Sequence, residues 1–178
     1  MAQKSETKTN NEENPMRKIR IEKIVLNVSG IAENLEKGFK LLSFLTKRKP
    51  AKMKSKKRIP SLNVRPGLEV GAVVTIRKNK EELLKRLLAA VENTLRKKQI
   101  SANNFSFGIK EYLEIPGTEY QREIGIAGLD VTVVFRRFGK RVSLKKIKRG
   151  KASKKQMVSK EEIIKFMEDN FQTKFLGK

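Results

Sequence analysis

The chain has 178 residues, 38% of them hydrophobic, which is material for one modest core. Its 42 Lys and Arg residues face 19 Asp and Glu residues, and a net charge of +23 predicts a polyanionic partner that relieves self-repulsion in the folded state. The absence of Cys and His excludes disulfides, thiol nucleophiles and imidazole chemistry, removes the usual zinc ligands, and so disfavours most enzyme classes.

The first third of the chain predicts a tail, a strand and a helix. Residues 1–15 carry almost no apolar side chains and no periodicity, which predicts a disordered tail. Apolar and polar residues alternate over 18–28 with one slip at Glu22-Lys23, which predicts a strand with an irregularity. Apolar residues at helical spacing over 33–45 predict a helix.

A basic run and a second strand–helix pair come next. In Thr46–Arg58, eight of thirteen side chains are cationic and none is acidic. The segment 58–67 has two prolines and a glycine, so we predict a loop there. Clean alternation over 70–78 predicts a strand, and an apolar stripe over 80–98, with acids first and cations last, predicts a long helix.

The remaining elements are two strands, a second basic run and a helix. The segments 104–115 and 129–135 are β-like and are separated by a Pro-Gly turn. Residues 136–157 hold eleven cations in 22 positions and no acid. The apolar stripe of 159–171, preceded by Ser159 with Glu162 at capping-box spacing, predicts a closing helix.

The coarse order β-α-β-β-α-β-β-loop-α predicts an α+β fold, with an antiparallel or mixed sheet and helices packed on one face. We divide the chain into a tail (1–15), an RNA-binding core (16–135), and a basic loop with a C-terminal helix packed on that core (136–178). The uncovered face of such a sheet is a platform for unstacked bases and RNA backbone.

The positions of the charges favour RNA. The two basic windows hold 19 of the 42 cations and no acid; solvated loops or a nuclear localisation signal are the alternative interpretation of each run. The sequence shows no helix-turn-helix, zinc finger or leucine zipper, so it does not support one of the common classes of duplex-DNA-binding protein. The phenylalanines of "NFSFG" (104–108) are only distantly similar to the aromatic signature of the commonest single-strand RNA-binding module. Such rings are more often core residues.

Four stretches in this order resemble one family: "NPMRKIRIEKIVLNV" (14–28), "NFSFGIKEYLEIPGTEY" (104–120), "GLDVTVVF" (128–135) and "VSKEEIIKFMEDNF" (158–171). They are similar to the universal large-subunit ribosomal protein that binds 5S rRNA, called L-five in bacteria and L-eleven in eukaryotes, in its eukaryotic and archaeal branch. The resemblance implies a structural protein of the central protuberance, without catalysis, metal or cofactor. The implied partners are 5S rRNA, large-subunit rRNA, peptidyl-site tRNA and neighbouring ribosomal proteins. The implied location is the cytoplasmic ribosome, with nucleolar assembly in a cell that has a nucleus.

The resemblance also implies contact residues. Matched family positions and the first basic run place these residues on 5S rRNA: Asn27, Arg48, Lys52, Lys54, Lys56, Thr75 and Arg77. The tRNA-directed loop corresponds to 58–68 and contributes Arg58, Ser61, Asn63, Arg65 and Gly67. The second basic window adds further rRNA contacts: Arg136, Arg137, Lys140, Arg141, Lys145, Lys146, Lys148 and Arg149.

Three departures from the family pattern are visible. Arg48 replaces a common Gln, "NVSGIAENLE" (27–36) replaces a glycine-rich turn, and the loop lacks an aromatic residue near Leu62.

Two rival functions remain open on the sequence. A carboxylate-dependent RNA-processing enzyme would use Glu111, Glu114 and Asp130, but the first two would fall on opposite faces of the predicted strand. A free-standing RNA chaperone or membrane-surface binder would have the same charge. No apolar run nears the roughly 20 residues that span a bilayer, and we expect no signal peptide.

Overall fold

The computed structural model describes residues 14–151, 153 and 156–177, so the predicted tail lies outside the described residues except for Asn14 and Pro15. The strands are β1 (Arg20–Ser29), β2 (Ala51–Lys54), β3 (Glu69–Ile76), β4 (Thr94–Arg96), β5 (Ile100–Ser101), β6 (Asn104–Ile109), β7 (Leu129–Arg136) and β8 (Lys174–Leu176). The α-helices are α2 (Glu33–Thr46), α3 (Lys80–Ala89), α4 (Arg141–Leu144) and α5 (Lys160–Phe171). Short 3-10 helices lie at Pro15–Arg17, Pro60–Leu62, Lys97–Gln99 and Tyr112–Glu114.

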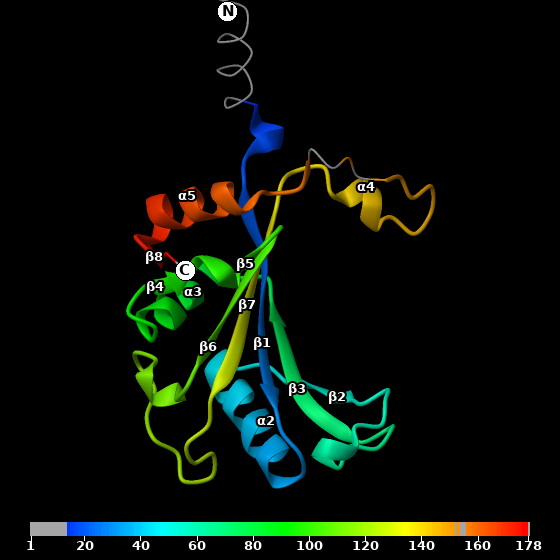
Figure 1. Ribbon diagram of the computed structural model, residues 1–178, viewed down its shortest axis with the longest axis vertical. Helices are drawn as coiled ribbons and strands as arrows, with labels where there is room; N and C mark the ends of the chain where they lie inside the picture. Colours follow the sequence, from blue (N-terminus) through cyan, green and yellow to red (C-terminus); the bar gives the residue numbers. More distant parts are fainter. Residues whose placement is uncertain (1–13, 152, 154–155, 178) are drawn as a thin grey trace, which may run out of the picture.

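One six-stranded sheet organises the fold, in the order β2-β3-β1-β7-β6-β5 (Figure 1). Every neighbouring pair in it is antiparallel, and β4 with β8 forms a separate parallel pair. The predicted α+β class with a largely antiparallel sheet is therefore confirmed. Strand β2, inside the first basic run, pairs with β3 and extends the sheet at one edge.

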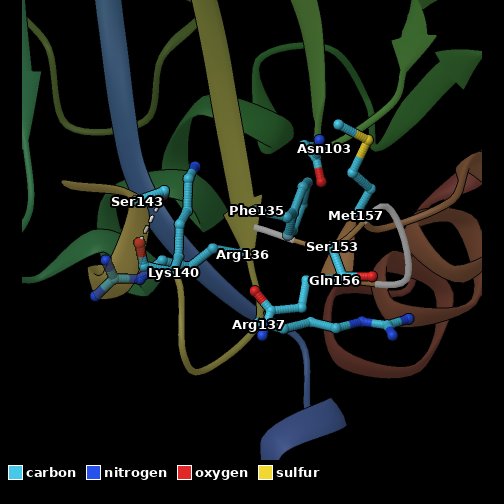
Figure 2. Close-up of a pocket in the computed structure, with 9 residues that line it drawn as sticks. All are labelled: Asn103, Phe135, Arg136, Arg137, Lys140, Ser143, Ser153, Gln156 and Met157. Carbon is cyan, nitrogen blue, oxygen red and sulfur yellow. Dashed lines mark hydrogen bonds between the residues drawn. The ribbon is translucent and has the colours of Figure 1, made fainter. Parts of the chain in front are cut away.

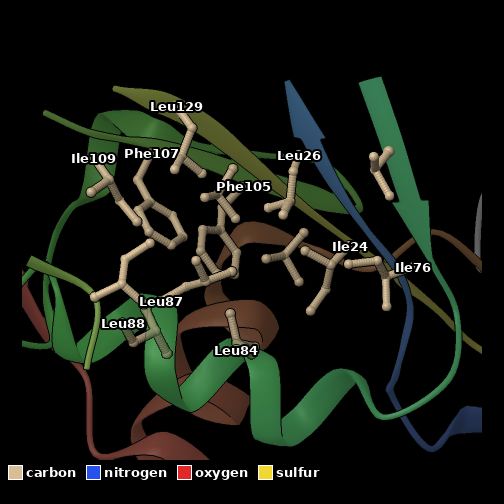
Figure 3. Close-up of a cluster of buried hydrophobic side chains, with 14 of the residues drawn as sticks. Ile24, Leu26, Ile76, Leu84, Leu87, Leu88, Phe105, Phe107, Ile109 and Leu129 are labelled. Carbon is tan, nitrogen blue, oxygen red and sulfur yellow. The ribbon is translucent and has the colours of Figure 1, made fainter. Parts of the chain in front are cut away.

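One face of the sheet is the core. Strand alternation sends every second side chain of β1, β3, β6 and β7 to this face. There they meet the apolar stripe of α3, as Figure 3 shows for Leu84, Leu87 and Leu88. Phe105 and Phe107 are buried here with ring centroids 5.9 Å apart, so the rings of "NFSFG" are core residues rather than a stacking platform for bases.

The irregularity predicted at Glu22-Lys23 is present. The register between β1 and β7 shifts between Ile21 and Lys23, so Glu22 is an extra residue in the strand. Alternation then resumes, and Ile24 returns to the core. The bulge places the carboxylate of Glu22 beside the cations that follow β7, where it forms two ion pairs.

The helix predicted over 80–98 is wrong in its second half. Helix α3 ends at Ala89, and Glu92 and Asn93 then take φ values of 52° and 54°, in the left-handed region that ends a helix. Leu95, part of the predicted stripe, is buried in β4 instead. The local apolar period predicts a helix here, but residues 94–96 form a strand because β8, far along the chain, pairs with them in parallel.

The strand predicted over 104–115 is also shorter, and it ends at Ile109. The chain then turns into a 3-10 helix in which Tyr112 is fully buried. Its phenol oxygen accepts a hydrogen bond from the backbone N–H of Gln121 at 2.9 Å, and this bond ties down the loop before β7. Glu111 and Glu114 therefore do not lie on a strand, contrary to the expectation above.

Helix α2 packs unusually close to the sheet. A Cβ built on Gly38 would lie 2.5 Å from Val28 Cγ1, so only glycine fits at this crossing. The predicted helix over 159–171 is confirmed, including the reciprocal capping box between Ser159 and Glu162. Within the described ranges, no helix is both long enough and apolar enough to cross a bilayer.

Candidate nucleic-acid interface

The uncovered face of the sheet carries small and polar side chains in register. One row runs across four strands as Ser106, Thr132, Val25 and Thr75, since each is the partner of the next. All four lie on the face opposite the core, and three have hydroxyl groups. Short hydroxyl side chains on a flat grid leave room for an RNA backbone and can bond to phosphate or 2′-OH.

Asn27 lies in the next row, where it is half-buried. Its partners are Asp130 on one side and Val73 on the other, and Gly108 lies beyond Asp130. Diagonally across, Gly71 has no side chain; a Cβ there would lie 3.8 Å from the Asn27 amide oxygen. The predicted contact residues Asn27 and Thr75 therefore share one face, in adjacent rows of the same strand pair.

The first basic run forms the edge of the sheet. Arg48, Lys54 and Lys56 are exposed, and none of them takes part in an ion pair within the described part of the chain. Lys52 is different, because its ammonium is 3.0 Å from a carboxylate oxygen of Glu69. All four residues of β2 are exposed, so this edge of the sheet presents cations that the protein compensates only in part.

The predicted tRNA loop is an ordered hairpin tip. An antiparallel bridge joins Ile59 to Val64, and Val64 is buried. Asn63 and Gly67 have φ values of 52° and 87°, so both turns use left-handed backbone. The five predicted residues of the loop are all exposed: Arg58, Ser61, Asn63, Arg65 and Gly67. Figure 1 shows this tip at the far end of β3 from α5.

Arg77 is exposed just past the end of β3, at the opposite end of that strand from the loop. The predicted 5S contacts therefore extend along the whole of β3, with Thr75 between the hairpin tip and Arg77.

Three cations of the second basic window form ion pairs within the protein, and two of them meet Glu22. This carboxylate, in the β1 bulge, pairs with Lys140 at 2.9 Å and with Arg136 at 3.7 Å. Burial is the largest influence on Glu22 and opposes its ionisation, but the hydrogen bond and charge of Lys140 and the charge of Arg136 outweigh it. The pKa of Glu22 is therefore below its ordinary value. These cations anchor the segment after β7 to β1.

Arg137 is 9% exposed and donates a hydrogen bond to Glu162 in the first turn of α5. Burial again has the largest effect on Glu162 and raises its pKa; the N–H of Ser159 and the guanidinium of Arg137 overcome it, so the net shift of the pKa is downward. This pair joins the end of the sheet to α5 and leaves little of Arg137 for RNA.

The other predicted cations of this window lie on a short projection, where Arg149 Nε donates a hydrogen bond to Ser143 O at 2.6 Å. Helix α4 is a single turn, and the segment after it folds back through a hydrogen bond from Gly150 N–H to Val142 O at 3.2 Å. All five cations on this projection are exposed, and they are Arg141, Lys145, Lys146, Lys148 and Arg149. In Figure 1 the projection and the hairpin tip lie at opposite ends of the sheet. Basic segments are therefore present at both ends. The α4 turn lies in a segment whose run of cations predicts only a loop.

The acidic candidates do not form a catalytic or metal site. Glu111 and Glu114 lie at the 3-10 helix after β6, whereas Asp130 lies on the open face of β7. Across the described residues, no group of three or more acidic side chains is arranged to hold a metal ion.

Comparison with known proteins identifies the class of protein first. Residues 69–166 match the model that describes the C-terminus of the ribosomal protein L-five family. The protein named large ribosomal subunit protein uL5 from Nanoarchaeum equitans is 43% identical over 162 residues, covering 88% of this chain and 95% of that protein. Those from Picrophilus torridus (38% over 170 residues, covering 93% and 97%) and Sulfurisphaera tokodaii (42% over 163, covering 89% and 92%) are similar.

These matches define a structural, non-enzymatic ribosomal protein of the rRNA-binding class. The chain belongs to the uL5 family of the large ribosomal subunit, in an archaeal-like form. The family resemblance stated from the sequence is thereby confirmed, and the carboxylate-dependent enzyme is excluded as an interpretation.

Proposed function

We propose that the protein holds 5S rRNA in the central protuberance of the large ribosomal subunit, with its open sheet face and first basic run against that RNA. The observation that carries the proposal is the arrangement of Asn27 and Thr75 on one uncovered face, beside the exposed cations of the sheet edge. Small hydrogen-bonding groups position an RNA backbone, and the cations neutralise its phosphates.

The hairpin tip at 58–68 extends toward the peptidyl-site tRNA in this proposal. Its exposed arginines, Arg58 and Arg65, supply planar guanidinium forks for phosphate. The tip lies at the edge of the sheet, away from α5, so it can reach a second RNA while the face holds the first. Large-subunit rRNA and neighbouring ribosomal proteins are the remaining partners, bound through the projection that follows β7. The ribosome in the cytoplasm is the site of action, with assembly in the nucleolus where a nucleus exists.

The first experiment is a competition. The purified chain is titrated with 5S rRNA, with tRNA, with an unrelated transcript of the length of 5S rRNA, and with anionic liposomes at physiological salt. We expect 5S rRNA to bind at least roughly tenfold more tightly than the unrelated transcript, and log affinity to fall with log salt at a slope of about −6 to −7 if about eight phosphates are neutralised. Equal affinity for all RNAs would indicate a general chaperone, and equal affinity for liposomes a membrane-surface binder. Either result would refute the proposal.

A pair of matched variants tests which surface of the protein binds 5S rRNA. Lys54→Gln removes an exposed cation at the sheet edge, whereas Lys85→Gln removes an exposed cation on α3, behind the core. The first should reduce 5S affinity several-fold and the salt slope by about 1, and the second should change neither. A photo-crosslinker at Ser61 in assembled ribosomes should label peptidyl-site tRNA, and the same group at Lys85 should not.

A further inference from the structure

A cleft lies on the core side of the sheet, between the helices that cover it. Its volume is about 390 Å³, and its walls are the end of α2, the end of β3 and the first turns of α3. Ile76, a core-side residue of β3, lines the cleft, whereas the preceding residue, Thr75, is on the open face. The cleft and the open face therefore lie on opposite sides of the same strand.

The lining of the cleft is strongly basic. Four cations and one acid line it: Lys47 and Arg48 follow α2, Lys78 follows β3, and Arg86 and the acid Glu82 are on α3. None of these five side chains takes part in an ion pair within the described part of the chain. Positive groups that converge on a hollow repel one another and focus a positive field in it, so the cleft favours an anion.

A second basic recess, at the end of β7, provides a contrast (Figure 2). Its three cations all have acidic partners, since Arg136 and Lys140 pair with Glu22 and Arg137 pairs with Glu162. The fold supplies carboxylates for that recess. Among the described residues it supplies none within pairing distance of the four cations in the cleft.

Helix dipoles explain only part of this placement. Lys47 and Arg48 follow the C-terminal end of α2, and Arg86 is in the last turn of α3, where cations are favoured. Lys78 precedes the N-terminal end of α3, where the dipole favours an acid instead. Arg86 is also half-buried, and its Nε donates a hydrogen bond to Pro116 O at 3.2 Å. This bond orients the guanidinium, whose other N–H groups remain as donors for a ligand.

We propose that this cleft binds the sugar-phosphate backbone of an RNA segment other than the one on the open face. No described residue of the lining is aromatic, so the cleft offers no ring for a base to stack on and fits the backbone instead. Its ammonium and guanidinium groups pair with phosphates, and the exposed Asn79 beside them bonds to a 2′-OH. The sheet then lies between two RNA segments. That the first of these is 5S rRNA rests on the proposed function.

Methyl NMR tests the proposal on the full chain. The protein is labelled at its Leu and Val methyl groups and saturated with 5S rRNA, and a short uridine oligomer is then added. We expect shifts at Leu45 and Leu83, which line the cleft, and none at Val25 on the open face. If the oligomer places about three phosphates in the cleft, the log of its affinity should fall with log salt at a slope of about −2. An oligomer that leaves Leu45 and Leu83 unshifted would overturn the proposal.

A matched pair of variants locates the site. Lys78→Glu and Lys165→Glu each reverse one exposed cation, at the cleft and on α5 respectively. Lys78→Glu should remain folded, because an acid is favoured before α3. It should weaken oligomer binding several-fold and leave 5S affinity unchanged, whereas Lys165→Glu should change neither. Equal losses of oligomer affinity in the two variants would show that the cleft is not the site.

A competitor and a separate measurement complete the test. Oligo-glutamate carries negative charge without ribose or phosphate, and it should displace the oligomer far less well than unlabelled RNA does. Equal displacement would mean that the cleft accepts any polyanion, including an acidic protein, and would overturn the assignment to RNA. The preference for 5S rRNA over an unrelated transcript is measured independently. Its absence would refute the proposed function alone, because Leu45 and Leu83 report oligomer binding in the free chain as well.

Discussion

Replacing Gly38 with alanine tests the close crossing of α2 over the sheet. In an isolated helix this change stabilises by about 1 kcal/mol, because glycine loses more backbone entropy than alanine. Here the new methyl would lie 2.5 Å from Val28 Cγ1, and a β-branched valine has little rotamer freedom with which to move aside. Overpacking of this kind costs about 1–3 kcal/mol, so we expect a net loss of about 0–2 kcal/mol in the free energy of unfolding.

The sign of the effect should reverse when the obstruction is removed. Val28→Ala alone should cost about 2 kcal/mol, since Val28 is 7% exposed and loses two methyl groups. In that background Gly38→Ala should stabilise by about 1 kcal/mol, because the helix propensity gain is no longer opposed and the methyl fills the space. The coupling energy of the cycle should then be about 1–3 kcal/mol.

The free energy of unfolding of wild type, the two single variants and the double variant is measured by urea denaturation, with circular dichroism as the probe. Lys37→Ala, an exposed neighbour in α2, is the control and should change the free energy by less than about 0.5 kcal/mol. A stabilisation of about 1 kcal/mol by Gly38→Ala in both backgrounds would refute the reasoning, since it would mean that Val28 and Gly38 do not meet.

Three further outcomes follow from other contacts. Gly128→Ala places a Cβ 2.6 Å from a backbone carbonyl oxygen, so it should destabilise by about 3 kcal/mol in urea, while Gly177→Ala, with open space around it, should be neutral. The pKa of Glu22 is lower in the folded than in the unfolded state, so the ionised carboxylate stabilises the fold fully above the unfolded pKa, and this contribution is lost as pH falls through the folded pKa. Between about pH 6 and pH 3 the wild type should therefore lose more stability than Glu22→Gln. Parallel pH profiles of the two proteins would count against this. Ser159→Ala removes the oxygen that accepts from Glu162 N–H and should lower the melting temperature through a loss of about 1 kcal/mol, whereas Ser159→Asp should retain the cap; equal losses would contradict the capping role.

Local patterns in the sequence were sufficient where each element is stabilised by its own periodicity. Strands β1, β3 and β7 alternate and lie near the predicted positions, and α5 starts at the predicted cap. The bulge at Glu22 was visible as a break in alternation for the same reason.

The predictions failed where a distant partner decides the structure. The apolar stripe continues past Ala89 as a helix would, and only the pairing of β4 with β8 shows that Leu95 belongs to a strand. Charge runs are likewise uninformative about individual cations. Arg137 and Lys148 look alike in the second basic window, yet the first is buried against Glu162 and the second is exposed. Two features of the sequence could have singled out Arg137. The alternation of β7, continued past Phe135, places Arg137 on the core side, and the capping Glu162 of the closing helix is an acidic partner for it.

Asn27 and Thr75 illustrate what the sequence supports for the interface. Alternation alone places both on the uncovered side of their strands, but it does not say that the strands are neighbours in the sheet. The cross-strand register adds that information.

The parallel pairing of β4 with β8 has a consequence for the order of events during synthesis. Leu95 is opposite Phe175, so β4 emerges well before the segment that completes it. Until residues 174–176 have been made, the backbone donors and acceptors of 94–96 must remain with water or find another chain. Translation speed and a chaperone at the exit port would therefore affect this small site, although none of its residues is proposed to bind RNA.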